Sequence, residues 1–247
     1  MKRYFPILGA ALLLVLPSCR FIRVSDEFKK QMKEQGVNYN AGQDNGRGIT
    51  ASDIIASREE QPGDFSSLIC NLPGDMTYLP GECAVSLSGP DNVLEHISVI
   101  NDEGQLTIKS DGINFRNLKK LKIVLSAPEI ENMDFNGAVD FEAPLGITAP
   151  SFSVTVNGAC DINIKGLKTG AASITVNGAG DITVKEIESE SLAVEINGAG
   201  DATVEGRTGK ADLNIRGAGN VDARGLVADE FNSKVRGAGS IRRPLPH

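Results

Sequence analysis

Asn177-Gly-Ala-Gly-Asp181 and Asn197-Gly-Ala-Gly-Asp201 are two copies of a motif that decides the fold of this chain. The motif occurs six times, and the first glycines of its copies are Gly137, Gly158, Gly178, Gly198, Gly217 and Gly237. Successive copies are separated by 21, 20, 20, 19 and 20 residues. A near-constant period of this length is typical of repeat proteins, in which each unit buries its apolar face against its neighbours.

Apolar and polar residues alternate on both sides of each motif. Leu192, Val194 and Ile196 precede one copy, and Ile182 and Val184 follow another. This period of two indicates strands that bury one face. We therefore predict an all-β fold, a parallel β-solenoid with one repeat of about 20 residues per coil. Right-handed winding follows from the crossover rule. An antiparallel sandwich or barrel remains the alternative, because Asn-Gly also favours hairpin turns.

The motif itself is predicted to form a tight corner of the coil. Its glycines would supply positive φ angles there. Its alanines would form a column that points into the core, where only a methyl group fits. These alanines are Ala138, Ala159, Ala179, Ala199, Ala218 and Ala238.

The N-terminus has the features of an export signal. Residues 1–18 contain two basic residues and then a short apolar run, which predicts a signal peptide. The following Cys19 completes a sequence that resembles the lipobox of bacterial lipoproteins, so Cys19 is the expected lipidation site and membrane anchor. Arg20 is not the Asp that retains lipoproteins in the inner membrane, which favours the outer membrane. An ordinary signal peptide followed by a chance cysteine is the alternative.

The remaining chain divides by composition and pattern. Residues 19–48 are rich in Gly and Asn in their second half and predict a tether. Residues 49–130 alternate without a visible repeat and predict a less regular β moiety, formed by first coils or a capping sheet. Residues 131–243 contain the repeat solenoid, and residues 244–247 form a tail. Charge and proline near the C-terminus are typical of a protected sheet edge.

Composition excludes some classes of function. The chain has 247 residues and a net charge of −7, which argues against a nucleic-acid partner. Its two histidines leave little material for a His-based metal site or triad, and we predict no cofactor. Acidic residues dominate between Glu129 and Glu205, whereas basic residues dominate from Arg207 onward. This asymmetry indicates either a solvated surface or self-association of complementary ends.

The pattern that could most readily bind a cation or act in catalysis is a column of aspartates at one position of the repeat. Its members are Asp140, Asp161, Asp181 and Asp201. Each could accept backbone N–H bonds at its own turn, or the column could bind cations, or two carboxylates could act in catalysis. Catalysis would require carboxylates in unlike environments, and these positions are equivalent. We therefore predict no catalytic residue and no dedicated metal site. The aspartate column is the one place in the sequence that is kept as a candidate for cation binding.

Cysteines offer a second candidate feature. Cys70 and Cys83 flank a turn in an oxidising compartment, so a disulfide between them is possible. Cys160 is expected to be a small corner residue rather than a nucleophile, because no histidine lies near it in the repeat.

The sequence resembles the auto-transporter adhesin head, or GIN-domain, family of bacterial lipoproteins. The motif series and three further stretches carry the resemblance, namely residues 78–92, 104–108 and 121–128. The resemblance implies a β-solenoid of two moieties and a cell-envelope location. It implies little about activity, because the family is named from a suspected adhesive role and has no catalytic residues to transfer. Arg216, Arg236 and Cys160 depart from the family pattern.

Together these observations predict a cell-envelope lipoprotein with a non-catalytic, adhesin-like binding or structural role. Its partners would be the membrane, through the lipid anchor, and a glycan or protein ligand at the cell surface. The alternative is a carbohydrate-active β-solenoid enzyme of the polysaccharide lyase or hydrolase type.

Overall fold

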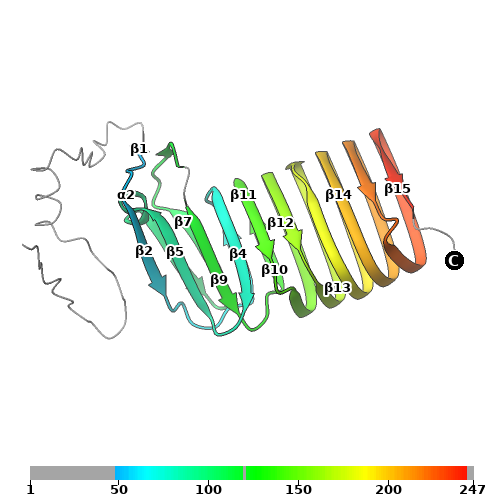
Figure 1. The fold of residues 1–247 in the computed structure, drawn as a ribbon, viewed down its shortest axis with the longest axis horizontal. Helices are drawn as coiled ribbons and strands as arrows, with labels where there is room; N and C mark the ends of the chain where they lie inside the picture. Colours follow the sequence, from blue (N-terminus) through cyan, green and yellow to red (C-terminus); the bar gives the residue numbers. More distant parts are fainter. Residues whose placement is uncertain (1–47, 119–120, 244–247) are drawn as a thin grey trace, which may run out of the picture.

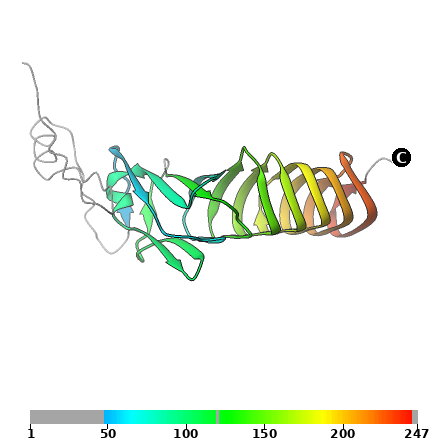
Figure 2. The same ribbon diagram turned by 90° about the horizontal axis from the view of Figure 1, so that it is seen from below.

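The computed structural model describes residues 48–118 and 121–243, which form a rod of stacked β-coils (Figure 1, Figure 2). The strands of the N-terminal moiety are β1 (Ile49–Thr50), β2 (Ile55–Glu60), β3 (Ser67–Cys70), β4 (Gly74–Pro80), β5 (Ala84–Pro90), β6 (Ile97–Asp102), β7 (Gln105–Ser110), β8 (Phe115–Arg116) and β9 (Lys122–Ala127). The repeat strands are β10 (Asn132–Phe135), β11 (Ala138–Ala143), β12 (Ile147–Ile164), β13 (Leu167–Ala179), β14 (Ile182–Asp222) and β15 (Leu226–Arg242). A single turn of helix, α2 (Asp91–Leu94), follows β5.

All pairings among β10 to β15 are parallel and join equivalent positions of the repeat. Asn157 pairs with Asn177, and Asn177 pairs with Asn197. The alternating pattern predicts this arrangement, because only one register keeps every apolar residue on the inner face. The parallel β-solenoid with coils of about 20 residues is therefore confirmed, and hairpins do not form the repeat. At about 4.8 Å per coil, each added repeat lengthens the rod by one strand spacing.

The N-terminal moiety is continuous with the repeats rather than separate from them. Strand β3 pairs in parallel with β10, and β4 pairs in parallel with β11. The parallel pairing continues for one more strand in each wall, with β7 on β3 and β9 on β4. Beyond them the sheet becomes antiparallel, with β6 on β7 in one wall and β5 on β9 and then β2 on β5 in the other. The boundary that we predict at residue 130 falls between β9 and β10, and the sheet passes from one moiety to the other without a break.

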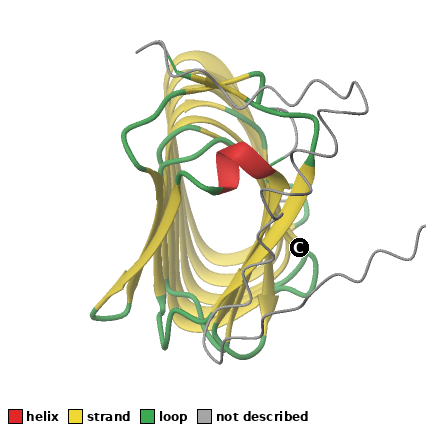
Figure 3. Ribbon diagram, turned by 90° about the vertical axis from the view of Figure 1, so that its left-hand side faces the viewer, coloured by secondary structure: helices red, strands yellow, loops and turns green. Residues whose placement is uncertain are grey.

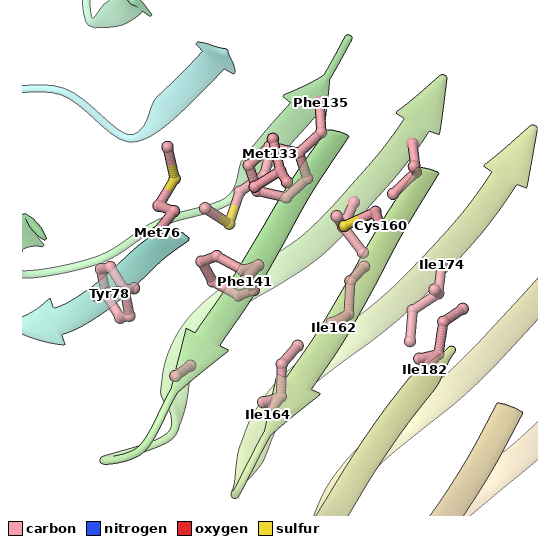
Figure 4. Packing of buried hydrophobic residues seen from close by; sticks show 14 of the residues in the cluster. Met76, Tyr78, Met133, Phe135, Phe141, Cys160, Ile162, Ile164, Ile174 and Ile182 are labelled. Atoms are coloured by element: carbon pink, nitrogen blue, oxygen red, sulfur yellow. The ribbon is translucent and has the colours of Figure 1, made fainter. Parts of the chain in front are cut away.

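The core fills the narrow space between the two walls. In the regular coils it consists of small sets such as Leu192, Val194 and Ile196, each at most 1% exposed. Burial of each such side chain contributes about 1.5–3 kcal/mol. The bulkier residues gather where the two moieties meet, as Figure 4 shows. There the rings of Phe135 and Phe141 lie 5.4 Å apart between their centres.

A short helix covers part of the N-terminal end of the rod. Helix α2 lies over the upper part of the opening between the walls (Figure 3). Asp91 and Asn92 of this helix are buried, and their side chains accept hydrogen bonds from the hydroxyl and backbone N–H of Ser52 at 2.5 and 2.9 Å. Arg58 reaches from β2 and donates to the backbone carbonyl oxygen of Leu94, the last residue of the helix, at 3.0 Å and to that of Ile97, just after it, at 2.7 Å.

The predicted inward column of alanines is wrong. Ala159, Ala179 and their equivalents are exposed on the outside of the corner. The glycines lie where the backbones of neighbouring coils come closest together. A methyl group on Gly178 would overlap the carbonyl oxygen of Gly158 on the preceding coil. The alternation of inward and outward residues simply continues through the corner, and this places the alanines outside.

No helix in the described part of the chain is long and apolar enough to cross a membrane. The predicted signal peptide, Cys19, the tether up to residue 47 and the tail lie outside the described residues.

Candidate functional site

A ladder of asparagine side chains runs along the outside of the repeated corner. Asn177 donates its side-chain N–H to Oδ1 of Asn157 at 3.0 Å, and Asn197 donates to Asn177 at the same distance. Asn157 in turn donates to Asn136 at 3.0 Å, and Asn136 donates to Asn71 at 2.9 Å. Five coils are therefore linked by side-chain amides as well as by backbone hydrogen bonds.

Arg216 ends the ladder. Its guanidinium donates to Oδ1 of Asn197 at 3.4 Å and also pairs with the carboxylate of Glu195. The substitution of Arg for Asn in the fifth motif copy therefore still satisfies the last amide carbonyl of the ladder.

The aspartates form a second column on the same corner. Oδ1 of Asp161 accepts the backbone N–H of Asp181 at 3.2 Å, and Oδ1 of Asp181 accepts that of Asp201 at 3.1 Å. Oδ1 of Asp201 accepts the N–H of Asn220 at 2.8 Å. Each of these three carboxylates thus caps the next coil, whereas we predict that it caps its own turn. The parallel register makes this possible, because equivalent residues lie one strand spacing apart.

The aspartate column brings the four predicted residues together and extends further. Asp140 pairs in register with Asp161 on one side and with Asp75 on the other. All of these carboxylates are exposed and in equivalent environments. Within residues 48–118 and 121–243, no group of three or more His, Cys, Asp or Glu side chains is arranged to hold a metal ion. The chemistry that the column carries out is backbone capping.

Sequence reasoning missed Asn71 and Asp75, the first members of the two columns. They lie 65 residues before their partners Asn136 and Asp140, and the residues between them do not match the motif. The signal that identifies them is the spacing, because Asn71 and Asp75 are four residues apart, as in every Asn-to-Asp copy of the motif.

A surface groove lies where the strands that lead into the motif begin, away from the corner that carries the two columns. One cavity of about 540 Å³ spans consecutive coils and is lined by Glu129, Thr148, Ala149, Pro150, Lys168, Thr169, Gly170, Glu188, Ser189 and Glu190. A second cavity of about 540 Å³ continues it along the rod and is lined by Glu186, Ile187, Glu188, Ser189, Gly206 and Arg207. Both cavities are open to solvent, so a ligand bound there would lie along the surface of the rod.

The floor of the groove is rigid and its rim is charged. Thr169 lines the first cavity, and its buried hydroxyl donates to the backbone carbonyl oxygen of Ala171 at 3.2 Å. Ser189, which lines both cavities, donates to the hydroxyl of the buried Thr208 at 2.9 Å. On the rim, Lys168 pairs with Glu188 at 3.1 Å, but both side chains remain about 70% exposed. An exposed pair of this kind contributes only about 0–1 kcal/mol, so a ligand can readily replace it.

Sequence reasoning did not identify the groove. Its floor consists of small residues at equivalent positions of successive coils, such as Ala149-Pro150 and Thr169-Gly170. These residues fall between two alternating runs and have no motif of their own. Only the register of the coils aligns them into a continuous surface.

The structure places the two cysteines of the possible disulfide apart. Cys70 and Cys83 are both free in the structure. Cys70 lies on β3, which pairs with β7 and β10, whereas Cys83 follows β4, which pairs with β9 and β11. The two residues therefore belong to different walls.

Cys160 is a buried core residue, only 3% exposed. Burial raises the pKa of its thiol to about 12, and the nearby Asp161 and Asp140 add to this effect. A thiol held protonated at neutral pH is a poor nucleophile. Cys160 therefore fills the core at a position where the next coil has Gly180.

Residues 64–243 match the family described as "Putative auto-transporter adhesin, head GIN domain". The chain belongs to this family. The match covers all of the regular coils and most of the N-terminal moiety. The resemblance predicted from the motif series is therefore confirmed. No match to the chain was found among curated proteins.

Solved structures share the fold of this GIN-domain chain. A Bacteroides fragilis protein described as a "putative adhesin" is 19% identical, with a TM-score of 0.63, over 79% of this chain and 100% of its own. A Parabacteroides distasonis protein with the same description is 17% identical, with a TM-score of 0.72, over 78% and 83%. Another protein of that species, described as a "Putative lipid binding protein", is 15% identical, with a TM-score of 0.63, over 78% and 95%.

Membership of the GIN-domain family indicates a role in adhesion and a location at the cell envelope or surface. The two side-chain columns and the groove are the outward features that the repeat builds on this domain. The columns are occupied by hydrogen bonds between coils, which leaves the groove as the candidate site for a ligand.

Proposed function

We propose that this chain is a lipid-anchored, non-catalytic module of the bacterial cell envelope that binds an extended glycan or protein ligand along its groove. The observation that carries the proposal is the groove itself, which crosses successive coils and combines a rigid floor with weakly paired charges at Lys168 and Glu188. Family membership supports the adhesive role.

The groove suits a ligand that is long and repetitive. Its two cavities share Glu188 and Ser189, so one chain-like ligand could lie across both of them. The carboxylates on the rim would accept hydrogen bonds from hydroxyl or amide groups, and Lys168 and Arg207 would bind acidic substituents. A rigid floor lowers the entropic cost of binding.

The anchor is proposed at Cys19. The basic residues and apolar run before it support export, and the residue after it supports delivery to the outer membrane. Acyl chains contribute about 0.8 kcal/mol per buried CH₂ group, and more than one chain is needed for stable anchoring. Residues 19–48 would then separate the solenoid from the membrane. Mass spectrometry of the membrane fraction should show an acylated Cys19, and Cys19→Ser should release the protein.

A glycan and host-matrix binding array, probed with the chain from residue 20 onward, tests the binding function. We expect at least one glycan or matrix ligand to be retained. Lys168→Glu should weaken that binding about ten-fold, which corresponds to the loss of one charge-assisted contact. Lys185→Glu makes the same charge change at an exposed position that does not line the groove, and it should bind normally. Equal binding by both variants would contradict the assignment of the groove.

A further inference from the structure

The two ends of the rod differ in what covers the last strands. Helix α2 covers part of the N-terminal end, and Arg58 holds it through hydrogen bonds to the carbonyl oxygens of Leu94 and Ile97. At the opposite end, β15 pairs with β14 on one side and with no other strand of the described residues on its other side (Figure 1). We call residues 226–243 the C-terminal tip. An open strand edge of this kind can pair with another chain.

The core is incompletely covered at the C-terminal tip. Val235 is 39% exposed, whereas Ile215, its register neighbour on β14, is 1% exposed. Phe231 is also only partly buried. Ser233 occupies the inward position that is taken by Leu213 on the preceding coil. The tip therefore presents apolar side chains and an open row of backbone donors and acceptors together.

Two opposite charges flank this apolar segment, and neither is paired with another residue that the structure describes. Among the described residues, Glu230 and Arg236 form no ion pair or side-chain hydrogen bond. Arg236 lies in register beside another cation, Arg216, whose guanidinium is already bound to Glu195. Arg236 thus lacks a carboxylate partner within the described part of its own chain.

We propose that a second copy of this chain pairs with β15 in an antiparallel arrangement centred on Ser233. In this register Glu230 of each copy faces Arg236 of the other, and Phe231 faces Val235. Inward residues remain opposite inward residues, so the two cores become continuous. The charges attract at both symmetric positions, and cross-strand pairs of this kind contribute to sheet pairing.

Neighbouring registers are less favourable. If the centre moves to Asn232, Glu230 faces Lys234 but Arg236 faces Ala228 and stays unpaired. If the centre moves to Lys234, Arg236 faces Asn232 and Glu230 faces Ala238. Only the register centred on Ser233 satisfies both unpaired charges while matching the apolar residues.

Arg243 covers the tip in the single copy. Its guanidinium lies 5.9 Å from the ring centre of Phe231 and donates to Oγ of Ser233 at 3.1 Å. This side chain must move aside before a second copy can pack against the core. The contact between copies is therefore expected to be reversible, and Arg243→Ala should strengthen it.

The geometry has a functional consequence, which rests on the proposed anchor at Cys19. A two-fold contact at the C-terminal tip places the N-terminal ends of the two rods at the far ends of the dimer. The N-terminal ends lead to the anchors, so the two copies would be held by different membranes. The contact would then join neighbouring cells or vesicles through like molecules.

Sedimentation equilibrium on the unlipidated chain of residues 20–247 tests the contact without any anchor. This chain retains the whole hydrophobic core, which lies within residues 49–226. We expect a concentration-dependent dimer that Glu230→Arg or Arg236→Glu weakens about ten-fold or more. A mixture of the two variants should restore the dimer, because the two substituted positions then face each other with opposite charges, and the unchanged Arg236 of one copy faces the unchanged Glu230 of the other. Lys185→Glu is the matched control and should dimerise normally.

A vesicle assay tests the bridging of membranes. The chain carries an N-terminal hexahistidine tag in place of the lipid and is bound to phosphatidylcholine vesicles that contain a nickel-chelating lipid. Wild-type vesicles should aggregate, vesicles with either variant alone should not, and a mixture of the two variant populations should aggregate again. A monomer at all concentrations, or a dimer that both charge reversals leave unchanged, would overturn the proposal. Because the tag replaces the lipid, these results do not depend on whether Cys19 is acylated.

Discussion

Asn177 and Asn157, twenty residues apart, are joined by a side-chain hydrogen bond of 3.0 Å on the outside of the solenoid. The same bond recurs between the neighbouring coils, so the ladder reinforces the backbone pairing from outside the core. A single repeat cannot make this bond, because donor and acceptor come from different coils. The ladder therefore explains why the motif keeps Asn at this position in four successive copies.

Removal of one rung should destabilise the stack. Asn177→Ala removes one donor and one acceptor, and we expect the free energy of unfolding to fall by about 1–2 kcal/mol. Thr175→Ala, at an outward position of the same strand, should change it by less than about 0.5 kcal/mol. Urea unfolding followed by circular dichroism measures both. Equal stability of the two variants would show that the ladder contributes nothing.

The inward glycines should not tolerate a side chain. Gly178→Ala would push a methyl group into the carbonyl oxygen of Gly158, and we expect a loss of about 3 kcal/mol or more. Ala179→Ser is the control, because Ala179 is exposed on the outside of the same corner. Thermal unfolding distinguishes the two. A large loss in the serine variant would instead support the inward column of alanines.

Charge repulsion along the aspartate column should be relieved by one amide. Asp181→Asn keeps the oxygen that accepts the N–H of Asp201, and it removes repulsion from Asp161 and Asp201. Asn220 already continues the column as an amide, because its side-chain NH₂ donates to Oδ1 of Asp201 at 3.0 Å and its Oδ1 accepts the hydroxyl of Ser240 at 2.8 Å. We expect a gain of about 0.5–1 kcal/mol at low salt, which shrinks as salt screens the charges. A loss of stability that is independent of salt would refute the repulsion between these carboxylates.

Calcium should have no specific effect on the same column. Each of the three linked carboxylates already uses one oxygen to cap the next coil, and no cluster of three metal-binding side chains occurs in the described ranges. The midpoint of thermal unfolding is expected to be the same in CaCl₂ and in NaCl of equal ionic strength. A shift seen only with Ca²⁺, and lost in Asp181→Asn, would restore the cation-binding hypothesis.

The cysteines should differ in reactivity. Cys83 is half-buried, whereas Cys70 and Cys160 are buried in the core. Iodoacetamide at pH 8 should therefore label Cys83 in the folded chain from residue 20, and the other two only after unfolding. Peptide mass mapping measures the labelling. A mass that shows Cys70 linked to Cys83 would contradict the structure at this point.

Alkaline conditions should weaken the fold through the same residues. Burial raises the pKa of Cys70 to about 11 and that of Cys160 to about 12, above the ordinary thiol value of about 8.5. The folded chain therefore holds these protons more tightly than the unfolded chain. The resulting stability is fully present below pH 8.5 and is lost as the pH rises toward 12. Cys160→Val, which copies Val139 of the preceding coil, should reduce that loss.

Much of the fold could be predicted from local patterns. The alternation around each motif identifies the inward face, and the period identifies the stack. The orientation of Ala159 could not be predicted in the same way, because it depends on whether the corner breaks the alternation or continues it. The approach of the Gly158 and Gly178 backbones decides this, and that approach is a property of two coils rather than of one.

The outward features depended still more on contacts between coils. The Asn71 rung and the groove floor at Thr169 arise only when the register of the stack is known. The Cys70–Cys83 pair also depends on the arrangement of the stack. The two cysteines are close in the sequence, but β3 and β4 lie in different walls.

Incubation of the chain with the glycan or protein retained on the binding array tests the central claim most directly. After prolonged incubation the ligand should be recovered at its original size, and its binding should be weakened by Lys168→Glu but not by Lys185→Glu. These results would show binding without turnover in the groove. Shortened ligand chains that accumulate with time would contradict the claim and would favour a carbohydrate-active enzyme.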